Sequence, residues 1–174
     1  MTTNETAPSA PRRVETARLV LRPFTLADHP TYARICSDPE VMRFIGAGGP
    51  NTPEVTWRVM AGTLGHWAML GYGIYAMQMR DGPVIGHAGF IDVPGWPGFE
   101  LAYLVDRAHW RQGYAGEACR ALLDVARHTL RKQRIVSLVR PANEPSKQLA
   151  RSLGAVQEGS VDLLGSPAEV FVYP

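Results

Sequence analysis

Short apolar runs rich in β-branched and aromatic residues recur along the chain, which is the pattern of strands with a buried face. They cover residues 19–24, 72–79, 84–93, 99–105, 134–139, 155–164 and 169–173. Asp81-Gly82 and the Pro/Gly cluster at 94–98 separate three of these runs at turn-forming positions. We therefore expect an antiparallel meander over residues 72–105 and a hairpin at the C-terminal end.

Helical spacing and start signals predict four helices among these strands. Thr25 has the character of an N-cap with Asp28 in the capping-box position, and the helix should end near Cys36. A second helix begins at Pro53, a third of 16 to 18 residues begins near Tyr114, and a short one covers residues 144–153. The face expected to point inward on the second helix carries Val55, Val59, Leu64 and Trp67.

This order of elements predicts the α/β (α+β) class, with a mixed, mainly antiparallel sheet of about six to seven strands and helices on both faces. The length of 174 residues suits a single domain over residues 13–174, after a disordered leader at 1–12. The apolar run at 67–77 is too short and too interrupted by glycine to cross a membrane, so a cytoplasmic protein is expected.

Composition narrows the classes of function. The chain is 45% hydrophobic and 20% charged, with a net charge of +2, so we expect no nucleic-acid partner. Its two cysteines, Cys36 and Cys119, are too few for a disulfide framework or a zinc site. We expect them to be small buried side chains, and we expect no metal.

One turn has the character of an anion site. The strand at 99–105 leads into a glycine-bearing segment that opens the long helix, whose first N–H groups have no helical partner. Gly113, Ala115 and Gly116 would let a phosphate approach the backbone, and Arg107 and Arg111 add positive charge nearby. A plain strand–turn–helix connection is the alternative. A nucleotide P-loop is excluded by the lack of Gly-Lys-Ser/Thr, and a dinucleotide fingerprint fits poorly.

Five segments, in this order, resemble the GCN5-related N-acetyltransferase (GNAT) superfamily, in its branch of ribosomal-protein N-terminal acetyltransferases. Residues 15–24 resemble the opening strand of that branch, and residues 38–44 the segment after its first helix. Residues 110–118, Trp-Arg-Gln-Gly-Tyr-Ala-Gly-Glu-Ala, resemble its cofactor motif. Residues 141–146 resemble its Asn-x-x-Ser motif, and residues 153–155 its Leu-Gly-Phe, with Ala155 in place of the aromatic residue.

The resemblance implies a GNAT-like fold that binds acetyl-CoA as co-substrate. The strand at 99–105 would splay from its neighbour at a bulge and pair with the pantetheine arm. An N–H near Tyr103 or Leu104 would polarise the thioester carbonyl, and the amides of the glycine-bearing turn would hold the pyrophosphate. The residues assigned to acetyl-CoA in this way are Tyr103, Leu104, Val105, Arg111, Gln112, Gly113, Tyr114, Ala115, Gly116 and Asn143.

The resemblance also implies direct attack by an amine, without a covalent enzyme intermediate. Glu100 is the candidate general base, acting through a water, with His87 and His109 as rivals. Ser146 is the candidate acid for the leaving thiolate, with Tyr173 in reserve. Each has a structural alternative: Glu100 as a solvated strand residue, and Ser146 as the N-cap of the short helix.

The acceptor is left open by the sequence. A protein N-terminus, an amino acid, a polyamine or an antibiotic would all supply an amine, and a homodimer is one option for the assembly. The two early helices would build the acceptor pocket. Four aromatic residues either line this pocket or belong to the core: Phe44, Trp57, Trp67 and Tyr72. The C-terminal hairpin is expected to be too short for substrate contacts. A non-catalytic acyl-CoA sensor is the alternative function.

Overall fold

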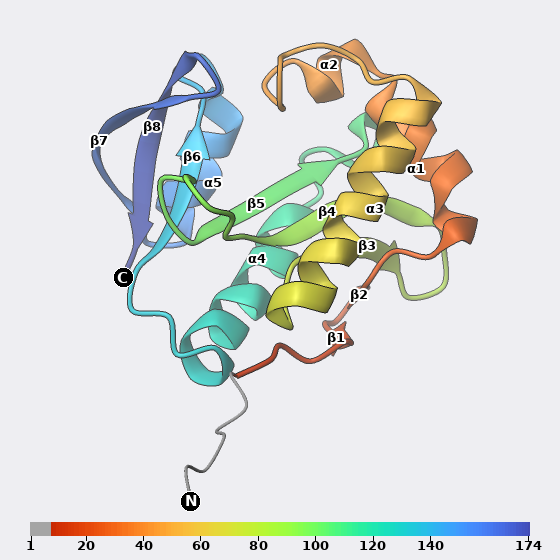
Figure 1. The fold of residues 1–174 in the computed structure, drawn as a ribbon, viewed down its shortest axis with the longest axis horizontal. Coiled ribbons are helices and arrows are strands. Elements are labelled where there is room, and N and C mark those ends of the chain that lie inside the picture. Colours follow the sequence, from red (N-terminus) through yellow and green to blue (C-terminus); the bar gives the residue numbers. More distant parts are fainter. Residues whose placement is uncertain (1–7) are drawn as a thin grey trace, which may run out of the picture.

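The computed structural model describes residues 8–174, which form one twisted sheet with helices packed on it (Figure 1). The sheet has eight strands in the order β1-β2-β3-β4-β5-β6-β8-β7. All neighbouring strands are antiparallel except β5 and β6, which are parallel. The strands are β1 (Val14–Glu15), β2 (Leu19–Arg22), β3 (Ile74–Met79), β4 (Val84–Ile91), β5 (Glu100–Val105), β6 (Ile135–Val139), β7 (Val156–Leu163) and β8 (Ser166–Tyr173).

The predicted class is confirmed, and so are the meander β3-β4-β5 and the hairpin β7-β8. The sheet has one strand more than the upper end of the expected range, because the two-residue β1 pairs with β2. A strand this short carries no apolar run in the sequence, which is why its pattern gave no signal.

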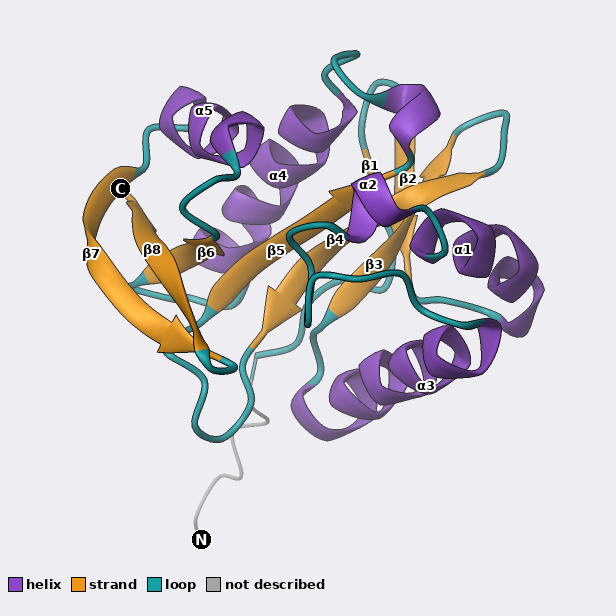
Figure 2. Cartoon of the chain, turned by 90° about the horizontal axis from the view of Figure 1, so that it is seen from above, coloured by secondary structure: helices purple, strands orange, loops and turns teal. Residues whose placement is uncertain are grey.

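Helices cover both faces of the sheet, as expected (Figure 2). One face carries α1 and α3, and the other carries α4 and α5. The helical segments are η1 (Leu26–Asp28), α1 (His29–Cys36), α2 (Pro39–Met42), α3 (Pro53–Leu70), η2 (Arg107–His109), α4 (Tyr114–Asp124), the π-helical η3 (Val125–Thr129) and α5 (Glu144–Ser152).

The predicted helix starts are present. The N–H of Thr25 donates to the Asp28 carboxylate at 2.7 Å, which completes a capping box, and Arg22 forms an ion pair with the same carboxylate at 2.8 Å. Thr52 caps α3, and Pro53 takes its first position. The capping box starts η1, which continues directly into α1, and Thr52 fixes where α3 begins.

The inward face predicted for α3 is wrong in three of its four positions. Val55, Val59 and Leu64 are 38%, 42% and 38% exposed, while Trp67 is buried. Thr56, Met60 and His66 are buried instead. The apolar residues of α3 are spread around the helix, so their spacing alone did not single out the face that packs on the sheet.

Two hydrophobic clusters lie on opposite faces of the sheet, because side chains alternate along its strands. On β3, Tyr75 and Met77 belong to the cluster under α4, while Ile74 and Ala76 belong to the cluster under α1. Both cysteines are buried as expected: Cys119 belongs to the first cluster and Cys36 to the second.

The chain before β1 is described only from residue 8. Within the expected leader, residues 1–7 lie outside the described part. Ala10 is 5% exposed and donates its N–H to Gly71 O, and the Tyr75 hydroxyl donates to Pro11 O at 2.9 Å. In the described part of the chain, no helix has both the length and the apolar character to cross a membrane.

Candidate active site at the divergence of two strands

The turn before α4 presents free backbone N–H groups. Gly113 has a φ of 81° and Arg111 a φ of 59°, so both adopt the left-handed conformation. The first helical hydrogen bond runs from Glu117 N to Gly113 O, at 3.0 Å. The N–H groups that precede Glu117 in the first turn of α4 are thus directed beyond the helix, and the helix dipole makes this end attractive to an anion.

A network of polar side chains holds this turn from behind. Arg18 donates to the Glu117 carboxylate at 2.6 Å and to Gln112 O at 2.9 Å, and its guanidinium lies 4.3 Å from the centre of the Tyr114 ring. Thr16 donates to Glu117 at 2.6 Å. Partial burial acts to raise the pKa of Glu117, but the hydrogen bonds from Thr16 and Arg18 outweigh it and lower this pKa. The Glu117 charge is therefore neutralised locally and does not oppose an anion at the turn.

The two arginines expected near the anion site differ in their contacts. Arg111 is exposed within the turn. Arg107 forms an ion pair with Asp38 at 3.1 Å, so its charge is partly neutralised by the segment before α2. Direct positive charge at the turn is therefore weaker than the sequence suggested, and the backbone N–H groups are its main feature.

The strands β5 and β6 diverge immediately beyond Glu100. They share one registered pair, Glu100 with Val136, and Val136 N donates to Phe99 O at 2.9 Å. Beyond that point, side chains take the place of backbone pairing: the Ser137 hydroxyl donates to Leu101 O at 2.6 Å. The expected splay is present. The expected bulge is not, since the register between β4 and β5 is unbroken from Gly86 to Ile91.

Strand alternation decides which backbone groups of β5 face the gap. Phe99 O and Leu101 O accept from β6, whereas Asp106 N donates to Ile85 O on the side of β4. Odd-numbered residues of β5 therefore face the gap and even-numbered ones face β4. This places the N–H of Tyr103, rather than that of Leu104, in the gap. The carbonyl of Val105 accepts from Trp110 Nε1 at 2.7 Å.

The side chain of Tyr103 lies on the α4–α5 face and contacts the start of α5. Its hydroxyl is 2.7 Å from Ser146 Oγ. Asn143 is the N-cap of α5, and its side chain accepts from Ser146 N at 3.3 Å. The structural alternative for Ser146, capping this helix, is thus wrong: Asn143 has that role, and the Ser146 hydroxyl is left to bond with Tyr103.

Glu100 is buried on the opposite face, at the point where β5 and β6 part. Its side chain is 6% exposed and accepts from Trp96 Nε1 at 2.7 Å and from Leu138 N at 3.3 Å. Burial raises the pKa of Glu100 to about 7, although these two hydrogen bonds act to lower it. A solvated strand position is therefore wrong for Glu100, and its carboxyl can exchange a proton near neutral pH.

The rival groups have other surroundings. His87 Nδ1 is 2.6 Å from the Tyr32 hydroxyl, and burial lowers the pKa of His87 to about 4. His109 lies in η2, with its ring beside Tyr114. The Tyr173 hydroxyl is 2.8 Å from Ser137 Oγ, and the side chain is 4% exposed. Of these groups, only His87 shares a cavity with Glu100.

A cavity of about 500 Å³ opens on the α1–α3 face and is lined by Glu100. Its walls come from α1, α2 and the segment after it, α3, strands β3 to β7, the loop between β4 and β5, the start of the segment after β6 and the β7–β8 turn. The C-terminal hairpin, although short, reaches this cavity and contributes Leu163 and Leu164 to its lining. Among the four aromatics left open by the sequence, Phe44 lines the cavity, while Trp67 and Tyr72 are core residues.

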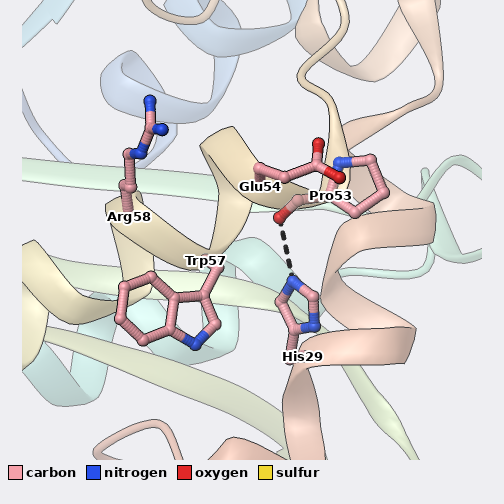
Figure 3. Close-up of a pocket in the computed structure, with 5 residues that line it drawn as sticks. All are labelled: His29, Pro53, Glu54, Trp57 and Arg58. Carbon is pink, nitrogen blue, oxygen red and sulfur yellow. Dashed lines mark hydrogen bonds between the residues drawn. The ribbon is translucent and has the colours of Figure 1, made fainter.

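The fourth aromatic, Trp57, lies elsewhere. It is 51% exposed and lines a separate hollow between the starts of α1 and α3 (Figure 3). There His29 Nε2 donates to Pro53 O at 2.9 Å, which ties the two helices together. This hollow shares no lining residue with the cavity at Glu100.

Comparison with known proteins identifies the family. Residues 18–156, more than half of the chain, match the family described as "Acetyltransferase (GNAT) domain". The chain is 32% identical over 149 residues to "Uncharacterized N-acetyltransferase p20" of Bacillus licheniformis, across 83% of this chain and 82% of that protein. The chain belongs to the GNAT acetyltransferase family.

Solved structures agree with this assignment. The acetyltransferase from Agrobacterium tumefaciens str. C58 superposes with a TM-score of 0.84 at 31% identity, over 98% of this chain and 99% of that one. Mycobacterium smegmatis RimJ, solved in complex with CoA-disulfide, has a TM-score of 0.79 at 19% identity, over 96% and 89% of the two chains, and shows the shared fold. The protein is thus an acetyltransferase of a family that uses acetyl-CoA.

The GNAT assignment can be tested against the chain's own geometry. The free N–H groups at Gly113 suit a pyrophosphate, and the gap beside Tyr103 offers backbone groups to an extended, amide-bearing arm. The residues present therefore fit acetyl-CoA. Within residues 8–174, no cluster of three His, Cys, Asp or Glu side chains is arranged to hold a metal ion.

Several residues of the GNAT site escaped the sequence analysis. Trp96, which donates to Glu100, lies in the Pro/Gly cluster, and this tryptophan among turn residues was a usable signal. Tyr32 and Arg140 also line the cavity. They belong to segments far apart in the sequence, and no local spacing connects them.

Proposed function

We propose that the protein transfers an acetyl group from acetyl-CoA to a primary amine by direct attack. The observation that carries this proposal is the position of Glu100. Its buried carboxyl lies where β5 and β6 part, between the open backbone of β5 and the cavity on the α1–α3 face. An amine in that cavity would approach the gap from the face opposite to α4 and α5.

The cofactor would be held mainly by backbone groups. The amides of Gln112, Gly113, Tyr114, Ala115 and Gly116 would bind the pyrophosphate, with Arg111 at its edge. The strand residues Tyr103, Leu104 and Val105 would border the pantetheine arm, and Asn143 would contact it from α5. Acetyl-CoA supplies the acetyl group in activated form, as a thioester, and the N–H of Tyr103 would polarise its carbonyl. The CoA-disulfide in the RimJ complex supports this use of the fold.

Glu100 is the best general base in the cavity. An amine with a pKa near 10 is mostly protonated at neutral pH and must lose a proton before it attacks. A base works best when its own pKa lies near the working pH, and Glu100 at about 7 meets this condition better than His87 at about 4. As the nitrogen–carbon bond forms and the carbon–sulfur bond breaks, Glu100 takes the amine proton, directly or through a water.

Ser146 would return a proton to the departing thiolate. Its hydroxyl pairs with that of Tyr103, whose backbone lines the gap. Burial raises the pKa of Tyr103, so this pair stays protonated at neutral pH and can donate. Tyr173 is less suited, because it is buried and bonded to Ser137.

The substitution Glu100→Gln tests the proposal. We expect turnover of acetyl-CoA with a panel of primary amines to fall on the order of 10²-fold or more, as for loss of a general base. Binding of CoA, measured by calorimetry, should not change. The exposed Glu158, which pairs with Arg134, offers the matched control Glu158→Gln. Unchanged turnover in the Glu100 variant would remove this residue from the mechanism.

A further inference from the structure

The cavity that would receive the acceptor carries few charges. Of the side chains that line it, Glu100 is the only carboxylic acid, and Arg140 is the only lysine or arginine. Both ring nitrogens of His66 are within hydrogen-bond distance of backbone groups, Tyr72 O and the N–H of Asp92, and burial lowers the pKa of His87 to about 4. Most of the remaining wall is apolar, with Phe44, Val59, Phe90, Leu104 and Leu163 among its residues.

One carboxylate can balance one ammonium group. Glu100 already accepts hydrogen bonds from two neutral N–H groups, and its remaining acceptor positions leave room for one cationic partner. A second ammonium group would find no second carboxylate among the side chains that line the cavity. Among residues 8–174, no Asp or Glu forms an ion pair with Arg140, so its charge is not neutralised. Burying a second cation there is strongly unfavourable.

Arg140 also bridges two walls of the cavity. Its Nη1 donates to Leu163 O at 3.1 Å and to Ser166 O at 2.9 Å in the β7–β8 turn. Its Nη2 donates to Gly46 O at 3.3 Å, in the segment after α2. Arg140 therefore joins these two segments at the cavity wall, and this closed stretch of wall favours a compact acceptor over one that continues as a chain.

We propose that the acceptor is a small primary monoamine carried on an apolar alkyl or arylalkyl body. This inference rests on the proposed function and narrows it. Polyamines, aminoglycosides and long peptides are disfavoured acceptors, the first two by their additional cationic groups and the third by the bridge at Arg140.

Two acceptors of equal size test the charge argument. Hexylamine and 1,5-diaminopentane have the same number of non-hydrogen atoms and differ in one terminal group, methyl or ammonium. We expect kcat/KM for hexylamine, measured by thiol release from acetyl-CoA, to exceed that for the diamine by tenfold or more, on the order expected when a charge is left unpaired in an apolar site. Calorimetry on CoA-saturated protein should show the same preference in binding.

A carboxylate added to the cavity should change this preference. Val59 and Leu64 lie on α3 and have similar exposure, but only Val59 lines the cavity. Val59→Asp should narrow or reverse the ratio between the two amines, and Leu64→Asp should leave it as in the unaltered protein. An equal effect of both substitutions would overturn the charge argument.

The outcomes separate this inference from the proposed function. A kcat/KM for the diamine equal to or above that for hexylamine would overturn the inference while acetyl transfer stands. A higher kcat/KM for a peptide with a free N-terminus than for hexylamine would do the same. Absence of transfer to any amine would remove the proposed function. If CoA-saturated protein then still bound hexylamine in preference to the diamine, the charge argument for the cavity would stand without the reaction, and if it bound neither, that argument would fail as well.

Discussion

The two faces of the sheet carry sites of different construction. On the α4–α5 face, the turn at Gly113 and the gap beside Tyr103 offer backbone groups, drawn from neighbouring stretches of chain. On the α1–α3 face, the cavity at Glu100 is built from side chains of helices, strands and loops that lie far apart in the sequence. A backbone site tolerates many sequences as long as its geometry is kept, whereas each side chain of the cavity affects what fits.

This difference separates what is common to the family from what is particular to this protein. The backbone site suits the acetyl-CoA that GNAT acetyltransferases share. The cavity, with one buried carboxylate and one unneutralised arginine, is where the acceptor would be selected. Substitutions on the α4–α5 face should therefore act on cofactor affinity. Substitutions on the α1–α3 face should act on turnover, on selectivity between acceptors and on the pH dependence of stability.

The largest difference between the faces should be seen in stability against pH. Burial raises the pKa of Glu100 from its ordinary value near 4.5 to about 7. A carboxyl that binds its proton more tightly in the folded state stabilises the fold below about pH 4.5, and this contribution is lost as the pH rises through about 7. The free energy of unfolding of the unaltered protein, minus that of Glu100→Gln, should fall by about 3 kcal/mol between these limits.

Urea unfolding at a series of pH values would measure this difference. For the exposed Glu158→Gln control, the same difference should change by less than about 1 kcal/mol. If the difference in free energy of unfolding between the unaltered protein and Glu100→Gln did not change with pH, the Glu100 carboxyl would ionise at no cost in the folded state. That result would contradict its burial and its suitability as a base at neutral pH.

On the backbone face, Gly113→Ala should weaken CoA binding by about tenfold, because a Cβ disfavours the left-handed conformation by roughly 1–2 kcal/mol. Gly165 supplies a matched control, since its φ of 79° is close to the 81° of Gly113 and nothing lies within 4 Å of its added Cβ. Both variants should lose similar stability, but only Gly113→Ala should lose affinity in calorimetry with CoA. An equal loss of affinity in both would assign the effect to general destabilisation.

The sequence predicted the backbone face well because its signals are local. The residue pattern of 110–118 contains both the turn and the start of α4, and the apolar runs located the strands on either side. The sequence could not predict the direction in which individual backbone groups point. Whether Tyr103 or Leu104 directs its N–H into the gap depends on the pairing of β5 with β4. Likewise, the contact of Arg107 with Asp38 depends on tertiary packing.

The cavity face was predicted only in part. Glu100 was singled out, but its burial arises from Trp96 and from the divergence of β6, and neither follows from periodicity. The face of α3 was misjudged because Val55 and Val59 line a cavity instead of the core. A hydrophobic pattern does not distinguish an apolar side chain that packs from one that borders an apolar cavity.

The smallest predicted effect concerns Arg18, which supports the backbone face from outside. In its ion pair with Glu117 the Arg18 side chain is 46% exposed, so Arg18→Ala should cost less than about 1 kcal/mol of stability. CoA affinity should nevertheless fall about three- to fivefold, which corresponds to a loss of less than about 1 kcal/mol of binding free energy. The reason is that Arg18 holds Gln112 O and offsets the Glu117 charge beside the anion site. Arg13→Ala removes a comparable exposed pair with Glu15 and serves as the control. If both variants bound CoA like the unaltered protein, Arg18 would have no part in holding the turn for the cofactor, and Thr16 would remain as the side chain that holds Glu117.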